Sequence, residues 1–142
     1  MFRGQYQHTL DEKGRIIIPA KFRERLGDTF IMTQGFEQCL FIYPMSEWEI
    51  LERQLMELPT TQKEERDFLR LLGSSAVEID TDKQGRVVIP AHLREYAQVH
   101  KDVYTIGVFT KIELWSKESW QQYSERIKGS FEEMAKNTGL KM

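Results

Sequence analysis

Two short segments of the chain place an aspartate and an arginine four residues apart, with a glycine directly before the arginine. The segments contain Asp11, Gly14 and Arg15, and then Asp82, Gly85 and Arg86. A guanidinium group at such a site can bind phosphate, or it can hold O6 and N7 of guanine, which contributes about 1–3 kcal/mol of base discrimination. A carboxylate repels DNA, so we expect the aspartates to accept amide hydrogen bonds of a turn or to orient the arginines.

Further basic residues stand close to these pairs. Lys13 directly precedes Gly14, and Lys83 comes two residues before Gly85. Lysine acts as a point charge, which suits contact with the phosphate backbone better than base recognition. Arg3 can add a weaker phosphate contact through a loose N-terminal arm. The candidate DNA-contacting residues are therefore Lys13, Arg15, Arg86, Lys83 and Arg3, and the turn-organising residues are Asp11, Gly14, Asp82 and Gly85.

An aspartate–glycine–arginine turn has an ordinary structural interpretation, a surface turn with one ion pair, which we would favour for an isolated copy. The presence of the same basic turn twice favours a functional interpretation. For Arg23 and Arg94, in the segments that follow, we expect packing or an ion pair with a carboxylate rather than DNA contact. Trp48 and Trp120 belong to apolar stripes, which favours the core or a subunit interface over base stacking.

No pattern in the chain predicts catalysis or metal binding. His8, His92 and His100 lack the spacing that is typical of metal sites, so we expect ordinary surface histidines. Cys39 lies in an apolar run, which favours a buried structural thiol. The motifs of common hydrolases, nucleotide-binding enzymes and metalloproteases are absent. We expect no enzyme activity, no cofactor, no metal and no small-molecule substrate.

The paired residues lie inside a repeat that must position them. The pattern D-x-x-G-R-[IV]-[IV]-I-P-A begins at Asp11 and again at Asp82, and the similarity continues to Trp48 and Trp120. In each copy an alternating stretch, a glycine turn and a β-branched run ending at proline predict a β-hairpin. The proline can then open a short helix, and a second strand pair follows. The predicted strands are 5–10, 16–18, 30–33, 40–43, 77–81, 87–89, 103–106 and 112–115, and the short helices are 20–26 and 91–97.

A longer amphipathic helix is predicted after each copy. In the first, Ser46 and Glu49 form a capping box, and Pro59 ends the helix. Thr61 and Glu64 can cap another helix, which we expect to end at Gly73. The apolar stripe of the second copy consists of Trp120, Tyr123, Ile127, Phe131 and Met134.

Charge is distributed unevenly along the 142 residues, whose net charge is −2. This acidic total counts against nucleic-acid binding. However, residues 1–26 carry six basic and three acidic residues, which gives +3, whereas residues 46–78 carry four basic and eight acidic residues, which gives −4. Screening over about 8 Å makes such local patches matter more than the total charge, so the acidic total does not exclude DNA binding. The first turn and its surroundings are richer in basic residues than the second, so we expect the first turn to dominate DNA contact.

No segment has the pattern of a signal peptide or a membrane span. We therefore expect no membrane partner, and a cytoplasmic, nucleoid-associated protein. One copy offers too little apolar surface to fold alone, since isolated hairpins are marginal in water. The two copies must pack on each other, with 1–74 as the first unit (core about 5–47) and 75–142 as the second (core about 76–119). Self-association through the helices is also expected.

The repeated D-x-x-G-R-[IV]-[IV]-I-P segments resemble the AbrB/SpoVT family of bacterial DNA-binding modules. The resemblance covers the chain from Met1 to about Gly139. It implies a mainly β fold with flanking helices, in which two tandem swapped-hairpin halves form one pseudo-twofold β-barrel. It also implies a ring-like homo-oligomer that binds repeated promoter elements upstream of division and cell-wall genes, including its own gene.

Two hypotheses from different classes follow. The twin basic turns favour a sequence-specific DNA-binding regulator of transcription, with double-stranded DNA and further copies of the chain as partners. The acidic total and the amphipathic helices favour an oligomeric protein-interaction scaffold without specific DNA binding. An antitoxin-like partner of a toxin is a third possibility, although such proteins usually carry a disordered tail where this chain has its second copy.

Overall fold

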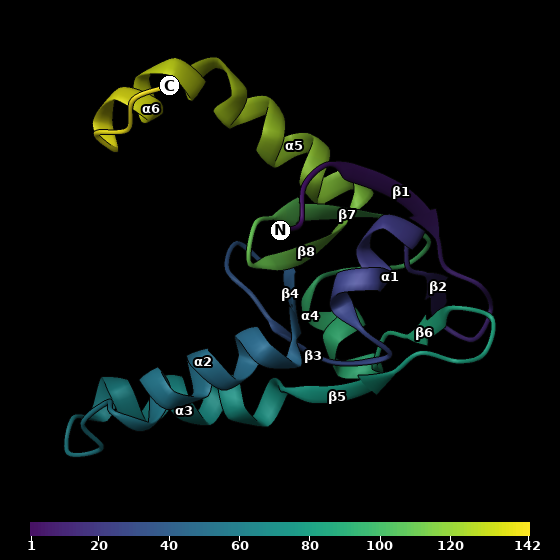
Figure 1. Cartoon of the computed structure of the whole chain (residues 1–142), viewed down its shortest axis with the longest axis horizontal. Helices are drawn as coiled ribbons and strands as arrows, with labels where there is room; N and C mark the ends of the chain where they lie inside the picture. The colour runs from purple at the N-terminus through teal and green to yellow at the C-terminus, as the bar shows by residue number, and fades with distance from the viewer.

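The computed structural model describes residues 1–142 and contains eight strands, six α-helices and one short 3₁₀ helix (Figure 1). The strands are β1 (Gln5–Thr9), β2 (Arg15–Ile17), β3 (Thr29–Gln34), β4 (Leu40–Pro44), β5 (Val77–Asp80), β6 (Arg86–Val88), β7 (Asp102–Val108) and β8 (Lys111–Ser116). The helices are α1 (Ala20–Leu26), α2 (Met45–Met56), α3 (Lys63–Ser75), α4 (Ala91–Tyr96), α5 (Lys117–Ile127), η1 (Lys128–Ser130) and α6 (Phe131–Asn137). Helices contain 42% of the residues and strands 29%. The helices therefore account for more of the chain, although the strands form its centre.

The strands of the two copies are interleaved. A six-stranded sheet has the order β1-β7-β8-β4-β3-β5, and β2 pairs with β6 in a separate two-stranded sheet. Both β1 and β5 therefore pair with a strand of the other copy, β7 and β3 respectively, and all these pairs are antiparallel. The predicted exchange of strands between the two halves is present in the fold.

The second strand pair predicted in each copy is confirmed as β3–β4 and β7–β8. The hairpin predicted at the glycine turn of each copy is wrong in its pairing. The strands before and after each glycine turn belong to different sheets, because β1 pairs with β7 whereas β2 pairs with β6. Only two backbone hydrogen bonds close the first turn, from Gly14 N to Asp11 O and from Asp11 N to Arg15 O, each at 3.0 Å. The chain turns at Gly14 as expected, but the strand after the turn, β2, pairs with β6 of the other copy.

The β-barrel implied by the resemblance is not formed by strand pairing. The edge strands β1 and β5 of the six-stranded sheet do not pair with each other, and β2 and β6 pair only with each other. The two sheets instead enclose a common core.

One apolar core joins both copies. Nineteen buried residues form a single cluster, and each copy contributes about half of them. From the first copy come Phe2, Leu10, Ile16, Ile18, Phe22, Leu26, Phe30, Met32, Leu40 and Ile42, and from the second Ile79, Val87, Ile89, Leu93, Ala97, Val99, Val103, Ile112 and Leu114. The expectation that neither copy can bury a core alone agrees with this shared packing.

The short helices begin as predicted, directly after the prolines. Pro19 and Pro90 occupy the N-cap positions of α1 and α4, with extended backbone angles that redirect the chain from strand to helix. Each helix buries one apolar face in the shared core, through Phe22 and Leu26 in α1 and Leu93 in α4. They therefore hold the ends of β2 and β6 against the six-stranded sheet.

The predicted capping boxes of the longer helices are not formed. Pro44 is the N-cap of α2, so Ser46 lies inside the helix, and no side chain caps it. Helix α3 has Gln62 at its N-cap and continues through Gly73 to Ser75, past its expected end. In the second copy Ser116 does cap α5, since its hydroxyl accepts a hydrogen bond from Ser119 N at 3.1 Å.

The longer helices extend away from the sheet as two arms, whereas β2 and β6 lie on the opposite side of the molecule (Figure 1). The stripe predicted as one helix from Trp120 to Met134 is interrupted by η1 at Lys128–Ser130. Helix α6 buries no residue. No helix has the length and apolar character that a bilayer crossing requires.

Candidate functional site

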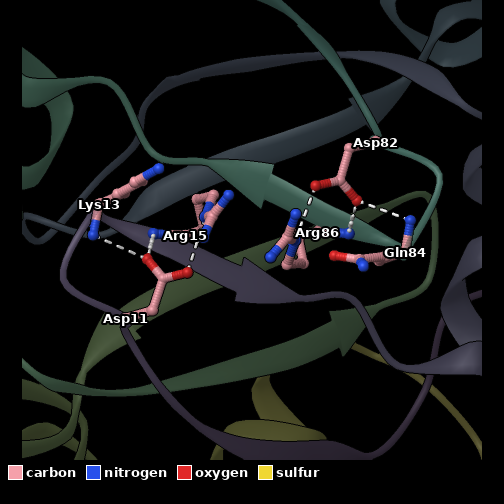
Figure 2. A network of polar contacts seen from close by, with 6 residues as sticks. All are labelled: Asp11, Lys13, Arg15, Asp82, Gln84 and Arg86. Atoms are coloured by element: carbon pink, nitrogen blue, oxygen red, sulfur yellow. Dashed lines mark hydrogen bonds and ion pairs between the residues drawn. The ribbon is translucent and has the colours of Figure 1, made fainter.

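Two loops of the same construction lie at opposite ends of the pair β2–β6, which we call the ribbon (Figure 2). In the first loop Asp11 Oδ1 accepts hydrogen bonds from the backbone amides of Lys13 and Arg15, each at 2.9 Å. In the second, Asp82 Oδ1 accepts the corresponding amides at 2.9 and 2.8 Å. Each aspartate thus organises its turn through local side chain–backbone bonds.

The second carboxylate oxygen of each aspartate holds the arginine. Arg15 Nε donates to Asp11 Oδ2 at 2.7 Å, and Arg86 Nε donates to Asp82 Oδ2 at 2.7 Å. Both interactions considered for the aspartates from the sequence are therefore formed. Since the aspartates engage only Nε, the Nη1 and Nη2 groups of both half-buried arginines have no ion-pair partner and remain available as a pair of donors.

The electrostatics of the loops favour charged aspartates. The backbone amide of Arg15, and then its side chain, hold the pKa of Asp11 below its usual value. The amide and side chain of Arg86 lower the pKa of Asp82 in the same way. Hydrogen bonds to the ionised form stabilise that form, so both carboxylates stay negative and both arginines stay fixed at neutral pH.

The loop glycines connect each loop to the other copy. Gly14 and Gly85 have φ angles of 74° and 81°, which a side chain would disfavour. The carbonyl of Gly14 accepts a hydrogen bond from Ile89 N at 2.9 Å, and that of Gly85 accepts one from Ile18 N at 3.3 Å. Each loop is thus anchored by the strand end of the opposite copy.

Two further arginines, which the sequence did not single out for DNA contact, lie on these glycines. A Cβ atom added at Gly14 would overlap Nη1 of Arg94, and one added at Gly85 would overlap Nη1 of Arg23. Both arginines come from the helix of the opposite copy and are half-buried. Neither forms an ion pair with a carboxylate, so of the two predicted roles only packing is observed. The sequence contains one signal that could have identified these two arginines, namely that each lies eight residues after the loop arginine of its own copy.

The ribbon presents one face to solvent and one to the core. Ile16 and Val87 are buried at the centre of their strands, and the residues on either side point outward with the strand alternation. The outward set, which we call the ribbon face, consists of Arg15, Ile17, Arg86 and Val88. Figure 2 shows the two arginines lying between the two aspartates, so both guanidinium groups belong to one surface.

The remaining candidate cations are placed differently. Lys13 is exposed on the first loop and Lys83 on the second, where Lys83 takes the position of Glu12. Arg3 lies at the far end of β1 from the loop, and a five-residue strand spans roughly 17 Å. The N-terminal arm is not loose, because Phe2 is buried and is held by two backbone hydrogen bonds. Phe2 N donates to Phe109 O at 2.8 Å, and Phe109 N donates to Phe2 O at 2.9 Å. The structure therefore does not bring Arg3 to the loops.

The tryptophans, the cysteine and one of the histidines considered from the sequence pack within the fold. Trp48 is buried, and Trp120 packs on the cluster of Cys39, Phe41 and Trp115. Burial raises the pKa of the Cys39 thiol strongly, which suppresses the thiolate. His8 is half-buried rather than exposed, with Nε2 2.7 Å from Thr105 Oγ1, and burial lowers its pKa. No group of three or more histidine, cysteine, aspartate or glutamate side chains is arranged to hold a metal ion.

Comparison with known proteins gives consistent results for the whole chain. The family model described as "MraZ protein, putative antitoxin-like" matches twice, over residues 1–71 and 72–141. Proteins named Transcriptional regulator MraZ from Caldanaerobacter subterraneus subsp. tengcongensis and from Thermoanaerobacter sp. (strain X514) are each 53% identical over 137 residues, or 96% of both chains. A protein of the same name from Clostridium tetani is 54% identical over 125 residues, or 88% of both chains. The two matches correspond to the two copies of the repeat, and the chain belongs to the MraZ family.

Proposed function

We propose that this chain regulates transcription by binding specific double-stranded DNA through the ribbon face and its two loops. The observation that carries the proposal is the presentation of two arginines on one face of the ribbon, each fixed through Nε by an aspartate and each with Nη donors that the aspartate leaves free. Their side chains are half-buried, at 22% and 31% exposure. The relatives are named transcriptional regulators, and the protein is not an enzyme.

The dimensions of the ribbon suit this function. The major groove is about 12 Å wide and admits a two-stranded β-ribbon. Within the groove, a guanidinium group with two parallel donors matches O6 and N7 of guanine. Because Asp11 and Asp82 fix the side chains before binding, Arg15 and Arg86 lose little conformational entropy when they engage a base.

Phosphate contacts are assigned to the cations around the loops. Lys13 and Lys83 are exposed at the loop tips, and we add Arg23 and Arg94, whose guanidinium groups lie on the loop glycines without a carboxylate partner. Such contacts position a protein on the duplex without specifying sequence. We exclude Arg3, which lies at the other end of β1.

We further propose that the protein acts as a homo-oligomer on repeated elements of promoters upstream of division and cell-wall genes, including its own. Self-association is supported by apolar side chains that the single chain leaves uncovered, Phe131 at 66% and Leu140 at 69% exposure. An apolar groove of about 340 Å³ also lies between α2, α3 and the sheet. Linked copies bind repeated elements with higher total affinity than one copy binds one element. The mass of the protein in solution tests this part directly.

A gel-shift titration on the DNA upstream of the gene tests the proposal. Specific binding should exceed binding to random DNA of equal length and should weaken as salt rises. Arg15→Ala should weaken it by about tenfold to a hundredfold, corresponding to the loss of one bidentate base contact. Because residues 1–26 around the first loop carry a net charge of +3, whereas the corresponding residues 72–97 carry −1, Arg86→Ala should have the smaller effect.

Arg15→Lys is the matched control. It keeps the charge but loses both the Nε bond to Asp11 and the fork of two donors, so it should retain nonspecific binding and lose specificity. A wild-type protein that shows no preference for its upstream DNA would contradict the proposal. Capture of a protein partner that survives loss of both arginines would instead support the scaffold hypothesis, which the apolar groove and the acidic helices favour.

A further inference from the structure

The ribbon face carries two aliphatic side chains that the arginines do not explain. Ile17 is 56% exposed and Val88 is 49% exposed, whereas their chain neighbours Ile16 and Val87 are buried at 2% and 1%. The buried pair serves the core, and the exposed pair does not. A β-branched polar residue such as threonine would satisfy the strand preference without exposing as much apolar surface.

The register of the ribbon places these side chains beside the arginines. Arg15 lies opposite Val88, and Ile17 lies opposite Arg86. Directly opposed Cβ atoms in an antiparallel pair are about 4.5–5.5 Å apart. The four side chains therefore form a small alternating array, in which each guanidinium group has an aliphatic group next to it and the two arginines are diagonal.

The array has the spacing of DNA. Two residues along a strand advance by about 6.8 Å, and two base-pair steps along a duplex advance by about the same distance, at about 3.4 Å each. A ribbon in the major groove can therefore present each arginine and its aliphatic neighbour to adjacent or next-adjacent base pairs.

The edges of the bases offer one aliphatic group in the major groove, the C5-methyl group of thymine. Asp11 and Asp82 each pair with one arginine, so these four groups carry no net charge. The excess positive charge around the face comes from Lys13, Lys83, Arg23 and Arg94, against Glu12 in the first loop. Exposed aliphatic groups beside guanidinium donors at this spacing match a duplex that carries thymine beside guanine.

We propose that Ile17 and Val88 are specificity-determining residues that contact thymine C5-methyl groups next to the guanines held by Arg15 and Arg86. The inference rests on the proposed function and deepens it, since it names which bases accompany guanine in the recognised element. Ile17 and Val88 recognise the methyl group by excluding water from it.

The test compares two versions of the upstream promoter fragment, one with thymine and one with uracil at every thymine position. Uracil pairs as thymine does but lacks the C5-methyl group. The wild-type protein should bind the uracil fragment more weakly by about fourfold for each methyl group contacted, the equivalent of about 0.8 kcal/mol. With two contacts the loss should be roughly fifteenfold.

The double variant Ile17→Ala/Val88→Ala should bind the thymine fragment as weakly as the wild type binds the uracil fragment, and should no longer distinguish the two. Ile50→Ala is the matched control, because Ile50 is a similarly exposed aliphatic residue, at 46%, on α2. It should retain the full preference for thymine. A general effect of uracil on duplex shape would weaken the double variant as much as the wild type.

Equal binding of both fragments by a wild-type protein that still prefers its promoter over random DNA would overturn this inference and leave the proposed function intact. Failure to prefer the thymine promoter at all would instead contradict the proposed function. A lower assembly mass in the double variant, with DNA preference unchanged, would show that the ribbon face joins copies of the chain, and this result would also overturn the inference.

Discussion

At the scale of single residues, Asp11 and Asp82 divide their two oxygens between two tasks. One oxygen closes the loop by accepting two amides, and the other fixes the arginine through Nε. Asparagine at either position can still accept the amides with its Oδ1, but its Nδ2 is a donor and cannot accept from a guanidinium group. The two tasks can therefore be separated by one substitution.

We predict that Asp11→Asn lowers affinity for the upstream DNA severalfold, because Arg15 loses the charge-assisted bond that fixes its side chain before binding. Circular dichroism should show an unchanged fold, since the amide contacts persist. A gel-shift titration measures the affinity. Unchanged binding by this variant would mean that Arg15 needs no fixation by Asp11.

The lowered pKa values of Asp11 and Asp82 predict an acid-dependent loss of stability. Both carboxyl groups have a lower pKa in the folded state than in the unfolded chain, where it is about 3.9. Their contribution to the free energy of unfolding is therefore complete above about pH 4 and is lost as the pH falls through the folded-state values. Urea unfolding between neutral pH and about pH 2.5 measures this loss.

The double variant Asp11→Asn/Asp82→Asn provides the control for the acid effect. It should lose less stability than the wild type over the same pH interval, because asparagine does not titrate. The lowered pKa of Asp67, which its contacts with Lys63 and Arg70 maintain, is common to both proteins and cancels in the comparison. Identical acid dependence of the two proteins would contradict the role assigned to the loop carboxylates.

At the scale of elements, the two copies begin their long helices by different means. After β8, the hydroxyl of Ser116 caps α5, whereas after β4 the N-cap of α2 is Pro44 and no side chain accepts a bond. We predict that Ser116→Ala lowers the free energy of unfolding by about 1 kcal/mol, as for other N-cap serines. Ser46→Ala, at the position where the sequence predicts a capping box, should change it by less than about 0.5 kcal/mol. Urea unfolding of both variants measures the difference, and equal effects would contradict the cap assignment.

The elements also show what the sequence could and could not predict. The periodicity and the turn glycines locate the strands and short helices closely, because alternation and positive φ are local properties. The partner of each strand is not local. Arg15 and Ile17 carry the same side-chain pattern whether their strand pairs within its own copy or with β6, so the predicted hairpin could not be distinguished from the exchanged pair.

The same distinction between local and non-local contacts applies to the candidate site. The contacts of Asp11 with Lys13 and Arg15 lie within five residues and were predictable from type and spacing. The placement of Arg94 on Gly14 depends on how the two copies cross, about eighty residues apart in the chain. The sequence shows that these arginines recur at equal spacing, but only the folded molecule shows which loop each one covers.

At the scale of the whole molecule, the core and the sheets have no boundary between the copies. Residues of both copies form one buried cluster, and β1, β2 and β5 each pair with a strand of the other copy. Residues 1–74 alone would therefore leave β1 and β2 without partners and half of the core exposed.

We predict that residues 1–74, produced alone, do not form a folded monomer. They should be either unfolded or dimeric, because a second identical copy can supply the strands that the missing half provides. Circular dichroism combined with a mass measurement in solution distinguishes these states. A folded, cooperative monomer would contradict the shared core.

The interleaving of two unlike copies in one chain also gives the molecule polarity. A pair of identical halves recognises palindromes, because the symmetry of the protein is repeated in the DNA. Here Glu12 and Lys13 in one loop correspond to Lys83 and Gln84 in the other, while the ribbon fixes both loops in one unit. Under the proposed function, a duplex bound across the ribbon face contacts a different loop at each end of the ribbon. Tandem duplication would then let the protein distinguish the two directions of a DNA element, which a symmetric dimer of either half could not do.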